Sequence, residues 1–304
     1  MANTKTTHGR QQAGVAILFS GHLRRSCVLA PVLHHVEVCH RSFLRCDVFV
    51  HTWAELEPRT PHWRRGWPRR NVTGPEFDSR ACFARLKQAV LGRGASLSML
   101  VEQQPEVPLD SALAPDGLPF NASGMLHWGA ARHFGWRMNV RGMAQAARLR
   151  RSSRKTHVLS LRVRPDDIWR FGTRDQVASL WGCMSRVAKA LLAGTRVRER
   201  VGVRWQGGSE VGVRSSWSIL AIGLHSCSHI NAGLTVVGND NCFFGTPRVL
   251  ERIYSRFVPS RYRDVYVGMS KARLPHDRPE LQLTVAAGLE RVPLGLPCTS
   301  SAYK

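Results

Sequence analysis

Two arginines and two aspartates lie close together near the middle of the chain, in the segment 157–171 (HVLSLRVRPDDIWRF). They are Arg162, Arg164, Asp166 and Asp167. Hard divalent cations take carboxylate oxygens, and a guanidinium group matches a phosphate with two parallel hydrogen bonds. These side chains could therefore hold a cation and a phosphate together. The alternative is an ion-paired strand end without function, because adjacent Arg and Asp side chains often only neutralise each other.

The residues just before this charged group predict a buried strand. Residues 158–163 form a short, mostly apolar run. Pro165 cannot continue a strand, because it has no backbone N–H to donate. Ligands of open α/β sheets bind beyond the carboxyl ends of the strands, so the charged group would lie at the edge where ligands are usually bound.

A second candidate binding group follows the first apolar run of the chain. Residues 15–19 predict a strand, and Ser20, Gly21 and Arg24 come directly after it. A small residue and a glycine at this point allow the backbone to approach a ligand closely, and an arginine just beyond can reach a phosphate. A plain turn with a solvated arginine is the alternative interpretation.

The order of the other elements predicts the fold class. A helix at 26–43 and a strand at 46–53 complete a βαβ unit with the first strand, which is the start of a doubly wound sheet. Further elements are expected as helices at 83–91, 125–150 and 175–192 and as strands at 96–101 and within 201–223. We therefore expect an α/β fold with a mostly parallel, Rossmann-like sheet flanked by helices.

Two later carboxylates could take part in acid–base chemistry. Asp240 lies in a predicted turn between two apolar runs of the segment 234–257, where a carboxylate needs partners or water. Thr246 and Pro247 predict that a helix begins just after it. Glu280 falls in the first turn of a last predicted helix, where it either interacts with the helix dipole or faces the site.

The composition is strongly basic. Lys+Arg 44 against Asp+Glu 21 gives a formal charge of +23, most of it from arginine. A GC-rich coding sequence can cause such a bias, but the charge also suggests a phosphate-bearing ligand or a polyanion. The loop 62–70 (HWRRGWPRR) and the basic stretch 148–155 keep a nucleic-acid or polyanion-binding function open as an alternative. Nucleic acid is not the expected partner, because the chain has no zinc-finger, RRM or basic-zipper signature.

The eight cysteines are scattered, without a CxxC pair. Cys46 and Cys242 stand in apolar runs, where we expect buried free thiols. His35 and Cys39 have the i, i+4 spacing of two zinc ligands on one helix, but nothing in the sequence supplies the other ligands. We therefore expect core or surface histidines on this helix.

The two ends of the chain are polar or short of structure. We expect a disordered lead over 1–12, a single domain over 13–295 and a tail over 296–304. The apolar run at 14–21 is too short for a signal peptide or a membrane span. Polar residues also interrupt the uncharged stretch 215–239. No transmembrane segment is expected, and a soluble, cytoplasmic protein is the default expectation.

Taken in order, four motifs resemble those of nucleotide-sugar-dependent glycosyltransferases with a GT-A-like fold. They are ILFSGHLR, CDVFVHTW, LSLRVRPD and NDNCFFGTPRVL, followed by a weaker PELQL, and they span about residues 14 to 290. The resemblance implies a nucleotide-diphosphate sugar donor bound near Ser20, Gly21 and Arg24, and a glycan or other hydroxyl acceptor near Asp240 and, less directly, Glu280.

The same resemblance implies that Asp166 contacts a metal ion, Mn²⁺ or Mg²⁺, or the donor diphosphate. Such enzymes often carry Asp-any-Asp, whereas Asp166 and Asp167 are adjacent. Adjacent residues of an extended segment point in opposite directions, so only one of the two is expected to bind a metal ion. Arg162 or Arg164 could neutralise the diphosphate instead. A catalytically inactive transferase-like domain remains a further alternative.

Overall fold

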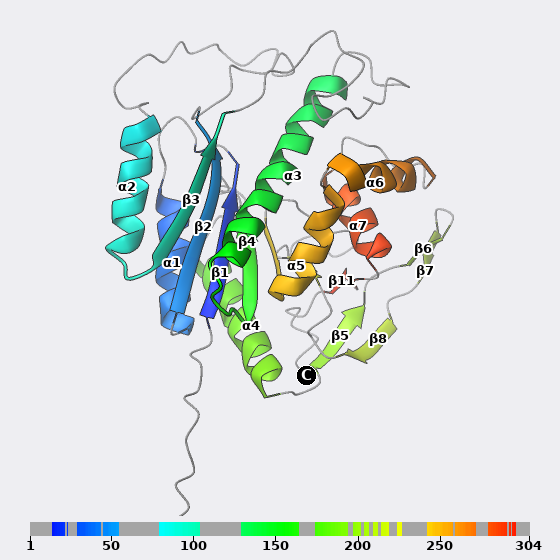
Figure 1. Cartoon of the computed structure of the whole chain (residues 1–304). Coiled ribbons are helices and arrows are strands. Elements are labelled where there is room, and N and C mark those ends of the chain that lie inside the picture. The colour runs from blue at the N-terminus through cyan, green and yellow to red at the C-terminus, as the bar shows by residue number, and fades with distance from the viewer. Residues whose placement is uncertain are drawn as a thin grey trace, which may run out of the picture.

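The protein has an α/β architecture, with helices on both faces of one large mixed sheet (Figure 1). The structure is a computed structural model. It describes residues 14–21, 23, 29–43, 45–54, 79–103, 129–163, 174–193, 197–201, 204–206, 209–211, 214–218, 224–226, 242–257, 259–271, 279–290, 292 and 294–295. The predicted lead at 1–12 and the predicted tail at 296–304 lie outside these ranges.

Four neighbouring strands of the sheet are parallel. In chain order they are β1 (Gly14–Ser20), β2 (Arg45–Trp53), β3 (Ser96–Glu102) and β4 (Leu159–Val163). They lie in the spatial order β3-β2-β1-β4, and β10 (Cys242–Gly245) pairs with β4 in the antiparallel direction. For these five strands, the prediction of a mostly parallel, Rossmann-like sheet flanked by helices is confirmed.

The sheet continues beyond β10 with shorter strands. They are β9 (Leu224–Ser226), β11 (Leu294–Gly295), β5 (Val197–Val201) and β8 (Arg214–Ser218), in that spatial order. A separate hairpin pairs β6 (Arg204–Gln206) with β7 (Ser209–Val211). Strands β6, β7 and β8 match the short strands expected within 201–223, whereas β5, β9 and β11 were not predicted there. The first apolar run of the segment 234–257 lies outside the described residues.

One face of the parallel strands is covered by three helices. They are α1 (Ala30–Ser42), α2 (Ser79–Leu91) and α4 (Arg174–Leu192). Every other residue of β1 points to this side, and Val15, Ile17 and Phe19 are buried against the helices. The intervening residues are buried on the other face, which explains why these strands are apolar along their whole length.

The opposite face packs against the remaining helices. They are α3 (Gly129–Ser152), α5 (Pro247–Tyr254), α6 (Pro259–Lys271) and α7 (Pro279–Leu289), with a 3₁₀ turn at Ser255–Phe257. The predicted start of α5 is confirmed, because the Thr246 hydroxyl accepts a hydrogen bond from the Val249 amide at 3.4 Å and Pro247 opens the helix. None of the described helices is long and apolar enough to span a membrane.

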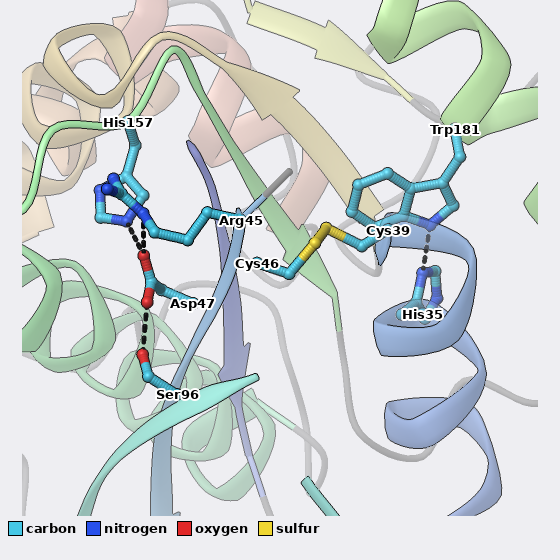
Figure 2. The surroundings of a disulfide bond; sticks show 8 residues. All are labelled: His35, Cys39, Arg45, Cys46, Asp47, Ser96, His157 and Trp181. Atoms are coloured by element: carbon cyan, nitrogen blue, oxygen red, sulfur yellow. Dashed lines mark hydrogen bonds and ion pairs between the residues drawn. A yellow bond between two sulfur atoms is a disulfide. The ribbon is translucent and has the colours of Figure 1, made fainter. Parts of the chain in front are cut away.

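A disulfide joins Cys39, near the end of α1, to Cys46, near the start of β2 (Figure 2). The two Cα atoms are 6.2 Å apart. The prediction of a free thiol at Cys46 was therefore wrong. Its burial was correctly predicted, but the fold brings a second buried cysteine within bonding distance. The side chain of Cys242 is outside the described part of the chain.

Cys82 and Cys183 are disulfide-bonded as well, and no described cysteine is free. Disulfides form and persist in oxidising compartments. The cytoplasmic location stays a prediction, and these bonds argue against it.

His35 belongs to the core beside this disulfide. Its Nδ1 accepts a hydrogen bond from the Trp181 indole at 3.2 Å, and both side chains are buried (Figure 2). Burial, with a smaller contribution from His34, lowers the pKa of His35 to about 3, so the ring is neutral. The expectation of a core histidine is confirmed, and Cys39 is not available as a metal ligand.

Candidate functional site at the carboxyl ends of the parallel strands

The carboxyl ends of the four parallel strands bring polar side chains to one edge of the sheet. Ser20 of β1 pairs with His51 of β2, Trp53 of β2 pairs with Glu102 of β3, and Leu18 of β1 pairs with Arg162 of β4. Side chains alternate along each strand, so Ser20, His51, Glu102 and Arg162 share the face that α3 covers. Between these groups and the polar residues at the amino end of the strands, the face is apolar, with Leu18 and Phe49 buried on it.

Ser20 and Gly21 form the turn that follows β1, where donor binding was predicted. Gly21 has φ 126°, a backbone conformation that favours glycine, and its amide donates to the His51 carbonyl oxygen at 3.3 Å. Ser20 is fully buried, and its Oγ has no hydrogen-bond partner among the described residues. Arg24, the third predicted member of this group, lies outside them.

Arg162 is fully buried within β4. Its guanidinium carbon lies 5.8 Å from the ring centroid of Phe243 on β10, the distance of a cation–π contact. Tyr254 of α5 lies nearby: burial raises the pKa of its hydroxyl, and the charge of Arg162 opposes that rise. The arginine therefore supplies a positive charge beneath the edge of the sheet, and it is not a solvated strand end.

The predicted carboxylates Asp166 and Asp167 follow β4 in the sequence, and Asp240 precedes β10. The end of β4 and the start of β10 are paired. Val163, the last residue of β4, pairs with Cys242, the first residue of β10. The segment that carries Arg164, Asp166 and Asp167 therefore leaves the sheet where the segment that carries Asp240 enters it. All four of these side chains lie outside the described residues. Glu280 is the second residue of α7, and its side chain is likewise not described.

The structure adds a hydrogen-bonded cluster that the sequence did not predict. His51 Nε2 lies 3.0 Å from Glu102 Oε2. Gln145 of α3 donates to the other carboxylate oxygen at 3.2 Å, and Arg141 Nε lies 3.5 Å from Oε2. A carboxylate only accepts hydrogen bonds, so His51 carries its proton on Nε2.

The second nitrogen of His51 faces α3 without a partner. A Cβ atom on Gly142 would lie 2.8 Å from His51 Nδ1 and 3.5 Å from Ser20 Cβ, so a glycine lets the helix approach this closely. Nδ1 is buried and accepts no hydrogen bond from any described group. Burial lowers the pKa of His51, Glu102 opposes this shift, and Arg141 adds to it. The ring is thus a buried neutral imidazole.

The cluster could not be found from sequence spacing, because its members are far apart in the chain. His51 and Trp53 stand in the run CDVFVHTW, which only indicated the end of a strand. The strand register and the placement of α3 bring His51, Glu102 and Gln145 together. The alternation of β2 was the available signal, since it puts His51 on the same face as the buried Phe49.

The described residues contain no group of three or more His, Cys, Asp or Glu side chains that could hold a metal ion. The predicted ligands Asp166 and Asp167 are not among them, so the divalent cation stays a prediction. No protein-family model matches the chain, and no curated protein or solved structure is significantly similar to it.

Proposed function

We propose that the protein is a glycosyltransferase with a GT-A-like fold that moves a sugar from a nucleotide-diphosphate donor to a hydroxyl acceptor. The pairing of Val163 with Cys242 is the observation that supports this most. Val163 belongs to the RVRPD motif and Cys242 to the NDNCFFG motif, so the two motifs meet in the sheet. Val163 also pairs with Phe19, two residues before Gly21. That point lies at the carboxyl ends of parallel strands, where α/β enzymes bind nucleotides.

The arginines that follow β1 and β4 in the sequence suit a diphosphate. Arg24 and Arg164 can each make paired hydrogen bonds to a phosphate group, and the glycine at position 21 permits close backbone approach. Arg162 contributes a fixed positive charge from within the sheet, where a low dielectric strengthens its effect. A preorganised positive environment stabilises the negative charge that develops on a leaving diphosphate.

In the proposed reaction, the bond between the anomeric carbon and the diphosphate oxygen breaks, and the diphosphate keeps the electron pair. A new bond forms from the anomeric carbon to the acceptor oxygen. If the reaction inverts the configuration at the anomeric carbon, the acceptor proton passes to a carboxylate, for which Asp240 is the first candidate and Glu280 the second. Asp166 is the candidate to hold a divalent cation, which when bound would supply further charge to the leaving group.

A thermal-shift titration of the purified protein with UDP, GDP, CMP and their sugars, with and without Mn²⁺, tests this proposal. A ligand that binds only the native state raises the melting temperature. We expect a shift with one nucleotide that weakens in Asp166→Asn and persists in Asp264→Asn, a control on an exposed carboxylate paired with Arg256.

Three results would argue against the proposal. If no nucleotide shifts the melting temperature, and the protein binds DNA or heparin with an affinity that falls steeply with salt, the polyanion-binding alternative holds. Nucleotide binding without transfer to any of a panel of glycan acceptors would indicate an inactive transferase-like domain. Unchanged transfer by Asp166→Asn would remove Asp166 from the mechanism.

A further inference from the structure

His51 connects three elements at the candidate site. Its carbonyl oxygen receives the amide of Gly21 at 3.3 Å, which links β2 to the turn after β1. Its Nε2 is hydrogen-bonded to Glu102 of β3 at 3.0 Å. Its ring lies against Gly142 of α3 and stands perpendicular to Trp53, with ring centroids 4.8 Å apart. The ring is fully buried.

Glu102 extends this connection to α3. Gln145 and Arg141 both approach its carboxylate, so the group that orients the His51 ring is itself held from the helix. The main chain adds another link, because the Ala54 amide donates to the Glu102 carbonyl at 2.8 Å. His51, the fully buried member of this partly buried network, has its ring orientation specified by the network, because its displacement would leave Nε2 without a partner.

We infer that His51 is a positioning residue: together with Glu102, it fixes the conformation of the Gly21 turn that receives the donor diphosphate. The inference rests on the proposed function for the identity of the ligand. The contacts of His51 with Gly21 and Glu102 are made within the chain itself, so they do not depend on a bound ligand. Burying His51 costs stability, because its Nδ1 has no partner among the described residues. The positioning role accounts for this cost, since Nδ1 lies where α3 packs closely at Gly142.

The protein contains a matched control in His157. This histidine is also buried, its Nε2 lies 2.9 Å from Asp47 Oδ2, and its ring stands perpendicular to Phe49. The pair lies at the amino end of β2, away from the Gly21 turn. A His157 variant therefore reports the general cost of losing a buried histidine–carboxylate pair, without affecting the proposed donor site.

The experiment compares His51→Leu, His51→Gln and His157→Leu in the full chain. Hydrogen exchange at the Gly21 amide is measured without ligand, and the dissociation constants of UDP and GDP are measured by calorimetry. We expect His51→Leu to speed exchange at Gly21 and to raise the nucleotide Kd about tenfold, the equivalent of one lost hydrogen bond. His51→Gln should recover most of both losses, because its side-chain amide can still donate to Glu102.

His157→Leu should lower the melting temperature but change neither Gly21 exchange nor the Kd. Equal Gly21 exchange in His51→Leu and His157→Leu would overturn the inference. If His51→Leu does not fold, Glu102→Leu serves instead, since this side chain is partly exposed and the change removes the acceptor of the His51 hydrogen bond. If the wild-type protein binds neither nucleotide, the proposed function fails, while the exchange comparison still decides the positioning role.

Discussion

Two buried histidine–carboxylate pairs lie at opposite ends of the parallel strands, on the face that α3 covers. At the amino end, Asp47 is 1% exposed and accepts hydrogen bonds from Arg45, Ser96 and His157 (Figure 2). Lys155 donates a further hydrogen bond to it. Burial alone would raise the pKa of Asp47, but the hydrogen bonds from His157, Lys155 and Ser96 and the charge of Lys155 outweigh it. The pKa therefore lies well below its usual range.

At the carboxyl end, the polar groups are less completely satisfied. Glu102 keeps a side chain that is 21% exposed, and its partners are His51, Gln145 and Arg141. Ser20 Oγ beside them is buried without a partner in the described part of the structure. Each histidine also has a buried Nδ1 without a partner among the residues that the structure describes, so this feature does not distinguish the two ends.

The difference shows how one sheet can combine stability with a binding edge. The amino end saturates a buried carboxylate with donors and adds the Cys39–Cys46 crosslink next to it, on the other side of β2 (Figure 2). The carboxyl end has buried polar atoms without described partners, Ser20 Oγ and His51 Nδ1, which cost stability. Ligand binding at this edge would offset that cost. We therefore expect substitutions at the amino end to affect unfolding most, and those at the carboxyl end to affect binding most.

The largest effect is expected for Asp47→Asn. The change leaves Arg45, Lys155 and His157 around a neutral group, and breaking a buried ion pair typically costs 3 kcal/mol or more. Arg45 and Lys155 are partly exposed, so we expect a loss of about 3 kcal/mol in the free energy of unfolding, measured by urea denaturation. Glu37→Gln, which breaks an exposed pair with Arg93, should cost less than about 1 kcal/mol. Equal losses in the two variants would break the comparison.

Removal of the Cys39–Cys46 bond is expected to cost slightly less. The bond closes a loop between residues separated by 7 positions, for which the chain-entropy model gives about 2.5 kcal/mol. The double variant Cys39→Ala/Cys46→Ala, compared with the oxidised protein in urea, measures this loss. Exchange at the Gly21 amide should stay unchanged, because the bond lies at the other end of β2. Faster exchange there would show that the two ends are coupled.

Local sequence pattern was sufficient for much of this fold. Continuous apolar runs gave β1 to β4 within one or two residues, and Thr246 with Pro247 marked the start of α5. Helix α6 was not predicted, although Tyr262, Val265 and Met269 are buried on it, because arginines and polar residues interrupt its apolar stripe.

The candidate site was predicted only where it is local in sequence. Ser20 and Gly21 lie where the first apolar run ends, and their place at the carboxyl end of β1 could be predicted from that position alone, while their role in donor binding stays a prediction. The contacts between His51 and Glu102 and between Cys39 and Cys46 depend on strand register and on the meeting of a helix end with a strand start. Such contacts depend on how the whole chain packs, so no short sequence motif predicts them.

A smaller effect is expected where α3 meets the carboxyl end. In Gly142→Ala the added methyl group would meet His51 Nδ1 at 2.8 Å, and overpacking of this kind costs about 1–3 kcal/mol against a gain in helix propensity of about 1 kcal/mol. We expect a net loss of about 1 kcal/mol and faster exchange at Gly21. Gly182→Ala in α4, where the nearest atom is 3.8 Å away, should instead stabilise the protein slightly. Stabilisation by both variants would mean that α3 does not pack closely on His51.

A change in pH is expected to separate the two ends. The pKa of His51 is lowered in the folded protein by burial, so below the unfolded value of 6.5 the unfolded chain binds more protons. Its contribution to stability is therefore complete above pH 6.5 and declines as the pH falls below it. The lowered pKa of Asp47 acts in a different pH range. Its contribution to stability is fully present above pH 3.8, the unfolded pKa, and is lost only as the pH falls below that value.

Urea unfolding at pH 7, 6 and 5 checks this separation. The free energy of unfolding should fall between pH 6.5 and 5, and His51→Gln should flatten that fall by at most about 1.4 kcal/mol per pH unit. His35 has the same sign, with a pKa of about 3, and His35→Gln should flatten the fall as well while leaving the exchange at Gly21 unchanged. At pH 5 the Gly21 amide should exchange faster than at pH 7 relative to the intrinsic rate, whereas amides around Asp47 should not. If protection at both ends declines together above pH 4, the histidine at the carboxyl end is not what responds first to acid.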